Sequence, residues 1–152
     1  MDLKLEVLVL PVADIERAKS FYTRLGFRED MDANDGDYRV IQFTPPGSDA
    51  SVIFGKGIKA TAAPVQNILL AVLDIEEARA DLITRGIEVS EIFHDTSGIF
   101  HHAEDAYLVA GPQPQRGSYG SYASFSDPDG NGWVLQEITE RLPGHEGALP
   151  RR

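Results

Sequence analysis

The sequence predicts an α+β fold made of two tandem modules, each with the element order β-α-β-β-β. Three observations predict it: an internal repeat, the same strand-then-helix pattern in both copies, and later strands that recur in the same order. The segments Val7–Phe27 and Asn67–Ile87 align without a gap at an offset of sixty residues. An internal period of this size is typical of duplicated supersecondary units. Identical pairs include Val12/Val72, Asp14/Asp74, Ile15/Ile75, Glu16/Glu76, Ala18/Ala78 and Gly26/Gly86.

Each copy begins with an apolar, strand-like run that ends close to an aspartate. Asp14 and Asp74 stand where a helix N-cap is expected, since a carboxylate there accepts a backbone N–H that the first turn leaves without a partner. The apolar periodicity after each aspartate predicts a helix of about three turns. Gly26 and Gly86 follow at the point where a helix C-terminus favours a left-handed residue.

Three further strands are expected after each helix, because strand-forming residues lie between clusters of turn residues. In the first module, Asn34-Asp35-Gly36 is typical of a tight hairpin between the second and third strands. In the second module the same strands are separated by His94–Ser118, about twenty-five residues, and a connection this long is usually functional or disordered. The expected strands are Phe27–Met31, Tyr38–Phe43 and Ser51–Phe54 in the first module, and Ile87–Phe93, Tyr119–Ser126 and Gly132–Thr139 in the second.

Composition excludes several classes of protein. The chain has 152 residues, is 42% hydrophobic and has no apolar run near the length of about 18 residues that a membrane span requires. Its formal net charge of −10 disfavours nucleic acid and anionic membranes as partners. The absence of cysteine excludes disulfides, a thiolate nucleophile and cysteine-based zinc sites. The N-terminus lacks the features of a signal peptide, so we expect a cytoplasmic protein.

The repeat also sets the expected boundaries within one domain. The segment Gly55–Pro64 is rich in small and turn residues, which is typical of a linker. We expect a first module at residues 1–57, a linker at 58–64, a second module at 65–139 with a long loop at 94–118, and a flexible tail at 140–152.

The stretch FSDPDGNGWVLQEI, Phe125 to Ile138, begins like an EF-hand calcium loop. That motif requires a bidentate glutamate at its twelfth position, where this chain has Ile138. Pro128 presets one φ angle, and the glycines and Asn131 accept positive φ. The stretch therefore predicts a turn that leads into a strand, and no calcium site.

Together these motifs resemble the vicinal oxygen chelate superfamily, which groups glyoxalase I, bleomycin-resistance proteins and extradiol dioxygenases. The residues that carry the resemblance are VLPVADIERAKSFYTRLGF, LAVLDIEEARADLITRG and SDPDGNGWVLQEI, and it spans about Leu3 to Thr139. The resemblance implies that the two modules curve their sheets around a shared cavity, with the helices outside. In the enzymes of this superfamily the cavity holds a divalent metal, and members often form homodimers.

The resemblance places the metal ligands of glyoxalase-like enzymes at four strand positions, which are a His or Gln on the first strand and a Glu on the last strand of each module. In this chain the four positions are Val7, Phe54, Asn67 and Val134. A metal site needs about three protein ligands, so we expect no inherited metal and no cofactor. A shift of one residue in the register would reverse the faces of a strand, and Glu6, Gln136 or Glu137 would then become relevant.

The long connection contains the remaining candidates for catalysis. His94, His101 and His102 lie near two acidic residues, and they suggest either acid/base chemistry or an unorthodox metal site. Adjacent histidines on an extended segment point in opposite directions, so His101 and His102 do not readily share one metal. The alternative interpretation is an ordinary polar surface loop. The catalytic candidates are therefore His101, His102 and Glu137.

Other side chains are candidates for lining the cavity. Arg39 lies on an alternating strand and suits a carboxylate or phosphate of a substrate, although an exposed edge-strand arginine is the simpler interpretation. Tyr122 suits an aromatic wall for a planar ligand. The full set of expected cavity residues is Val7, Arg39, Phe54, Asn67, Tyr122, Val134 and Gln136.

Two hypotheses about function follow from the resemblance. The first is a homodimeric protein that binds a small organic molecule, such as an antibiotic or toxic metabolite, without the inherited metal. The second is a lyase, isomerase or dioxygenase that acts on a small carbonyl or aromatic substrate through unorthodox metal ligands or the loop histidines. A structural or regulatory dimer with an incidental cavity is a third, simpler alternative.

Overall fold

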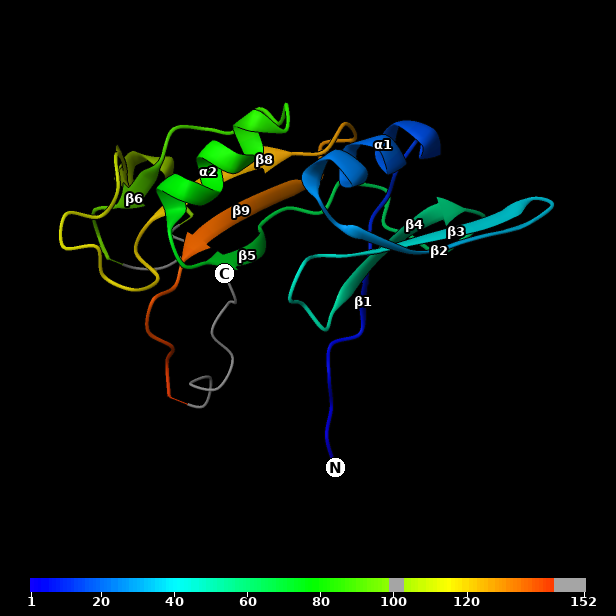
Figure 1. Cartoon of the computed structure of the whole chain (residues 1–152), viewed down its shortest axis with the longest axis horizontal. Coiled ribbons are helices and arrows are strands. Elements are labelled where there is room, and N and C mark those ends of the chain that lie inside the picture. Colours follow the sequence, from blue (N-terminus) through cyan, green and yellow to red (C-terminus); the bar gives the residue numbers. More distant parts are fainter. Residues whose placement is uncertain (99–102, 144–152) are drawn as a thin grey trace. The chain divides into compact units, whose positions relative to one another are not determined.

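The computed structural model describes residues 1–98 and 103–143, and Figure 1 shows its helices and strands. The chain divides into two compact units. The first unit combines Met1–Gln66 with Ser126–Gly132, and the second combines Asn67–Phe125 with Trp133–Arg152. The closing turn of the second module thus belongs to the first unit. In the described part of the chain no helix is long and apolar enough to cross a membrane.

The first unit contains one helix and a mixed four-stranded sheet in the order β1-β4-β3-β2. Strand β1 pairs parallel to β4, and the other neighbours pair antiparallel. The elements are β1 (Val7–Val9), α1 (Ile15–Leu25), β2 (Arg28–Asp35), β3 (Tyr38–Thr44) and β4 (Ser51–Lys56). Gly36 has φ +61° and lies in the predicted hairpin turn, where Asp35 pairs with Tyr38.

The predicted caps of α1 are confirmed. The side chain of Asp14 accepts a hydrogen bond from the backbone N–H of Arg17, and Gly26 ends the helix in the left-handed region at φ +94°. The buried face of α1 packs on an aromatic core in which the ring of Tyr22 lies 6.0 Å from Phe43 and 5.7 Å from Phe54. All three side chains are fully buried, so this core fixes which face of the sheet meets the helix.

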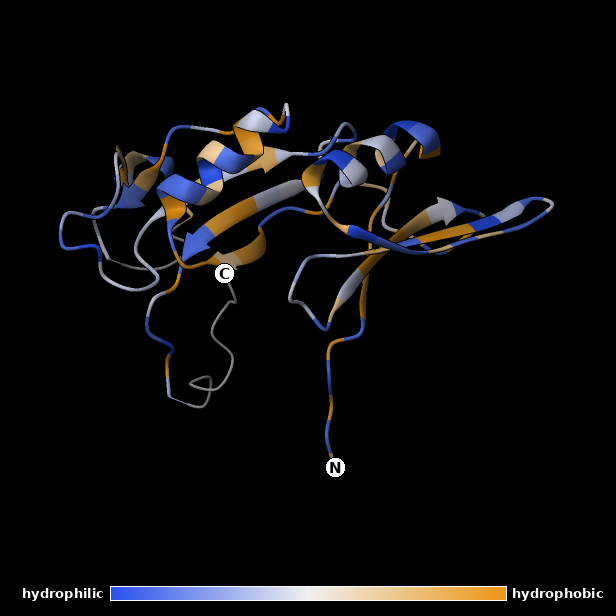
Figure 2. Ribbon diagram, in the orientation of Figure 1, coloured by the Kyte–Doolittle hydropathy of each residue, from blue (hydrophilic) through white to orange (hydrophobic). Residues whose placement is uncertain are grey.

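The second unit contains a helix of similar length and a mixed five-stranded sheet in the order β5-β9-β8-β6-β7. Strand β5 pairs parallel to β9, as β1 does to β4. Figure 2 shows that β5 is hydrophobic along its length. The elements are β5 (Ile68–Val72), α2 (Ile75–Thr84), β6 (Phe93–Asp95), the 3-10 helix η1 (Asp105–Tyr107), β7 (Leu108–Ala110), β8 (Tyr122–Ser126) and β9 (Gly132–Glu137).

The caps and core of α2 repeat the pattern of α1. Asp74 accepts hydrogen bonds from the backbone N–H groups of Glu76 and Glu77. The C-cap of α2 is Arg85, and the left-handed Gly86 at φ +82° comes one residue later than Gly26 does in α1. Phe125 and Trp133 stack in the core of the second unit with ring centroids 6.3 Å apart. The predicted α+β fold with two mixed sheets, each with one helix, is confirmed. The cavity shared between the modules remains a prediction.

The second module differs from the expected strands in several places. Strand β8 begins at Tyr122 rather than Tyr119, and β9 ends at Glu137 rather than Thr139. The strand predicted at Ile87–Phe93 begins only at Phe93, because Ile87 is buried after α2 and the following residues make isolated hydrogen bonds, such as Ser90 N–H to the Ser124 carbonyl. The connection predicted as loop contains η1 and β7, and β7 pairs antiparallel with β6. These additions widen the second sheet at the β6 edge.

Candidate functional site

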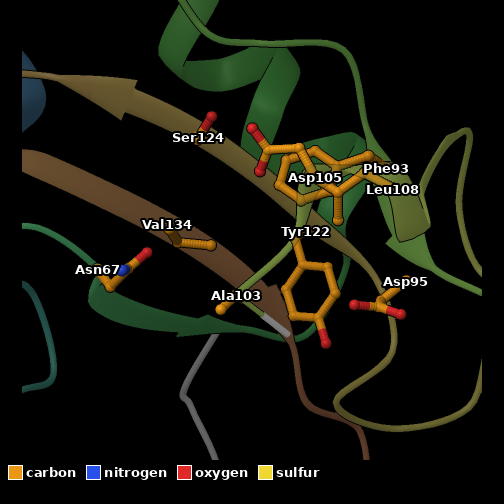
Figure 3. Close-up of a pocket in the computed structure, with 9 residues that line it drawn as sticks. All are labelled: Asn67, Phe93, Asp95, Ala103, Asp105, Leu108, Tyr122, Ser124 and Val134. Carbon is orange, nitrogen blue, oxygen red and sulfur yellow. The ribbon is translucent and has the colours of Figure 1, made fainter. Parts of the chain in front are cut away.

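The second unit contains a pocket of about 450 Å³ (Figure 3). Every residue that lines it belongs to this unit. The lining residues are Asn67, Phe93, Asp95, Ala103, Asp105, Leu108, Tyr122, Ser124 and Val134.

The sheet forms one wall of the pocket because its strands alternate. Tyr122 and Ser124 of β8 and Val134 of β9 line the pocket. Phe125 and Trp133, on the other face of the same strands, are buried in the core against each other. Glu137 of β9 lies on the same face as Trp133, and its carboxylate accepts a hydrogen bond from the backbone N–H of Ile75 at the start of α2. The pocket therefore lies on the sheet face opposite α2.

The long connection supplies the rest of the lining. Ala103, Asp105 and Leu108 come from the chain between β6 and the first residue of β7, and Phe93 and Asp95 come from β6 itself. The first module has only a tight hairpin at the corresponding place. The pocket thus depends on the part of the second module that the repeat does not share.

Two of the polar residues that line the pocket, Asp95 and Asp105, are acidic. Asp95 is 9% exposed, and its Oδ1 accepts hydrogen bonds from the backbone N–H and the hydroxyl of Ser97. Burial, and to a smaller extent the negative charge of Asp95, raise the pKa of the Tyr122 hydroxyl above its usual value. Tyr122 is therefore a neutral phenol at physiological pH, and its ring lies 5.5 Å from that of Phe93.

The four positions inherited from the metal enzymes separate between the two units. Asn67 and Val134 line the pocket of the second unit, and Val7 and Phe54 belong to the first unit. Phe54 packs in the core beside α1. The strand register explains why Phe54 does not match Val134. Leu69 pairs with Val134, and its equivalent in the first module, Val9, pairs with Ile53. Ile53 therefore stands at the first-module position equivalent to Val134, one residue before Phe54.

These side chains do not fit a divalent metal. Of the four predicted positions, only Asn67 has an oxygen or nitrogen donor, and Ile53 in place of Phe54 adds none. Within residues 1–98 and 103–143, no group of three or more His, Cys, Asp or Glu side chains has the arrangement of a metal site. The four predicted positions thus carry apolar or neutral side chains.

Glu137 lies on the α2 face of β9 rather than on the pocket face. It is 2% exposed, its carboxylate accepts two hydrogen bonds from the Arg116 guanidinium at 2.6 and 3.0 Å, and Oε2 also accepts from the backbone N–H of Ile75. Burial raises the pKa of Glu137, but the hydrogen bonds from Arg116 and Ile75 outweigh it and hold the pKa below its usual value. Gln136 is buried and donates to the carbonyl of Tyr119.

The remaining polar candidates are Arg39 and the three histidines of the long connection. Arg39 of β3 donates to Asp32 and Glu16 within the first unit, and these hydrogen bonds raise its pKa. The Nδ1 atom of His94 lies 2.8 Å from the carbonyl oxygen of Gly111. His101 and His102 lie outside the described residues.

Sequence reasoning missed several lining residues, although a signal existed for some of them. Ser124 lies two residues after Tyr122 in an alternating strand, so the choice of Tyr122 already implied it. Asp95 and Phe93 share a face of β6, but the predicted strand ended at Phe93. Asp105 lies in a connection whose path the sequence does not predict.

The comparisons with known proteins agree with this architecture. A family model described as "Glyoxalase/Bleomycin resistance protein/Dioxygenase superfamily" matches residues 4–135, most of the chain. The chain belongs to this superfamily. No match was found among the curated protein sequences.

Solved structures of the superfamily cover nearly the whole chain. TnmS3, an antibiotic binding protein from Streptomyces sp. CB03234, is 27% identical with a TM-score of 0.64, over 90% of this chain and 97% of its own. A glyoxalase/bleomycin resistance protein from the same strain is 27% identical with a TM-score of 0.61, over 88% and 100%. A superfamily member from Sphaerobacter thermophilus DSM 20745 is 26% identical with a TM-score of 0.63, over 90% and 98%.

Proposed function

We propose that this superfamily protein binds a small organic molecule, an antibiotic or toxic metabolite, in the pocket of its second unit and does so without the inherited metal. The observation that carries the proposal is the pocket itself, which combines aromatic and aliphatic walls with a few polar groups. Its volume of about 450 Å³ lies in the range of pockets that take small organic ligands.

Two further observations support the proposal. The donor chemistry of the four inherited positions does not suit a metal, which disfavours the metal-dependent reactions of the superfamily. The similar protein TnmS3 binds an antibiotic. The pocket offers aromatic and aliphatic surface beside polar groups, which suits the binding of a small organic molecule.

The test is a thermal-shift and calorimetric screen of planar aromatic antibiotics and related polycyclic compounds against the purified chain. We expect at least one compound to bind with one site per chain and to raise the melting temperature by mass action. The variant Val134→Trp places an indole in the pocket, so the same compound should lose at least about tenfold in affinity.

A matched control separates loss of the pocket from loss of the fold. Val109 lies on β7 next to the lining residue Leu108, but its side chain is exposed and does not line the pocket. Val109→Trp adds the same bulk and should bind as the wild type does. Equal affinity in wild type and Val134→Trp would contradict the proposed site, and a screen without any binding compound would contradict the function.

A further inference from the structure

We propose that Asn67 determines which ligands the pocket of the second unit prefers, namely aromatic compounds with an uncharged amide or lactam edge that pairs with the Asn67 carboxamide. This inference rests on the proposed function of the same pocket. It adds a chemical group of the ligand and the residue that recognises this group. Among the described residues that line the pocket, Asn67 alone carries a carboxamide.

The carboxamide of Asn67 places a hydrogen-bond donor and an acceptor side by side. Its nitrogen donates and its oxygen accepts, so one side chain forms two parallel hydrogen bonds with an amide or lactam. The other polar groups of the lining differ, because an ionised Asp95 or Asp105 only accepts and Ser124 has a single hydroxyl. Asn67 is exposed, and in the described part of the chain its carboxamide makes no hydrogen bond, so both atoms are open to a ligand.

The backbone of Asn67 has a conformation that favours this residue type. Its φ is +60°, in the left-handed region that asparagine adopts more readily than most residues do. Before it, the side chain of Gln66 donates a hydrogen bond to the carbonyl of Gly130 at 2.8 Å. After it, Ile68 pairs with Trp133 of β9. Backbone conformations of this kind concentrate at ligand sites, and here the anchors on both sides set the position of the carboxamide.

The neighbouring side chains of the pocket suit the planar part of the same ligand. Val134 lines the pocket, and the rings of Phe93 and Tyr122 lie 5.5 Å apart and are inclined by 31°. Figure 3 shows the carboxamide of Asn67 turned toward Val134, on the side of the Tyr122 ring away from Asp95. A few polar groups beside apolar walls fix the orientation of a bound ligand. A planar ring system that lies along these walls thus presents its polar edge to Asn67.

The experiment compares three neutral tricyclic probes of the same outline. Phenanthridinone is a lactam with a donor and an acceptor, phenanthridine has only an acceptor nitrogen, and phenanthrene has neither. Binding to the full chain is followed by the fluorescence of each probe. We expect the lactam to bind about tenfold more tightly than phenanthrene, since each of its two hydrogen bonds contributes about threefold, and phenanthridine to lie between them.

Two substitutions at Asn67 locate the hydrogen bonds. Asn67→Gly accepts the positive φ and removes the carboxamide, and Asn67→Asp keeps the shape of the side chain but has no N–H donor. Each should reduce the affinity for phenanthridinone by about fivefold or more and leave that for phenanthrene within about twofold. Asn34→Gly and Asn34→Asp make the same changes at an exposed position of β2 in the first unit and should alter neither affinity.

The ratio of the affinities for phenanthridinone and phenanthrene separates recognition by Asn67 from a change in the shape of the pocket, because a changed shape affects both probes. Equal affinities in the wild type, or an unchanged ratio in either Asn67 variant, would overturn the inference. If phenanthrene binds the wild type but not Val134→Trp, the proposed function stands even when the preference for the lactam is absent. If none of the three probes binds, the inference is overturned, whereas the wider screen of antibiotics decides the proposed function.

Discussion

The two units share a helix capped by aspartate and a mixed sheet, but they differ in what joins the second strand to the third. In the first unit β2 turns directly into β3 through Gly36. In the second unit the chain leaves β6, forms η1 and β7, and returns to β8 at Tyr122. Residues of this connection complete the pocket. The comparison shows that the repeated elements form the scaffold in both modules, and that the pocket also depends on a connection present in only one of them.

The two modules also differ in the turn before their last strand, although both turns belong to the first unit, and this difference gives the largest expected effect. Asp127 is 4% exposed, and its carboxylate accepts hydrogen bonds from the Tyr22 hydroxyl, the Asn131 side chain and the backbone N–H groups of Asn131 and Asp129. Asp127→Ala leaves several buried donors without partners, so the free energy of unfolding should fall by about 4 kcal/mol. Urea unfolding followed by circular dichroism measures it.

The control for this prediction is the corresponding turn of the first module. Asp49 lies there, before β4, and is exposed. Asp49→Ala should change the free energy of unfolding by no more than about 0.5 kcal/mol. A similar loss in the two variants would mean that the closing turn is not specially anchored.

The second prediction concerns the ends of the two last strands. Glu137, three residues after Val134, is buried and links β9 to Arg116 and to the start of α2. Lys56, three residues after Ile53, is largely exposed. Glu137→Ala removes a buried partner of a charged group and should cost about 3 kcal/mol of unfolding free energy, whereas Lys56→Ala should cost about 0.5 kcal/mol or less. Equal losses of unfolding free energy in Glu137→Ala and Lys56→Ala would contradict the difference between the two strand ends.

The smallest expected effect is a change in pH dependence. Because the pKa of Glu137 in the folded protein lies below its unfolded value, its stabilising contribution is complete above the unfolded pKa and is lost as pH falls through the folded pKa. Stability should therefore fall as pH decreases below about 4.3, and the fall should be shallower in Glu137→Gln. Unfolding midpoints measured across this pH range check the prediction. Identical slopes of the midpoint against pH in the wild type and in Glu137→Gln would contradict the lowered pKa of Glu137.

Much of the fold was predictable because its signals are local. The caps at Asp14 and Asp74 and the left-handed Gly26 and Gly86 follow from side-chain and backbone chemistry that depends on a few neighbouring residues. The repeat then extended these local features to two modules. The start of β6 was not predictable, because buried Ile87 has the apolar character of a strand residue although it packs after α2 without joining the sheet ladder.

The site was less predictable because it depends on register and on a long connection. A shift of one residue separates Phe54 in the core from Ile53 on the opposite face. Glu137 has the residue type of a metal ligand or a general base, and only the contacts with Arg116 and Ile75 show its place beside α2. The path that brings Asp105 to the pocket depends on tertiary packing, which the sequence pattern does not encode locally.

The most direct test of the central claim is a calorimetric titration of the best-binding aromatic compound before and after exhaustive chelation of the protein. Metal analysis of the same samples accompanies it. We predict one ligand per chain with the same dissociation constant in both samples, because the pocket binds the organic molecule through its own side chains. A stoichiometric transition metal whose removal abolishes binding would contradict the account.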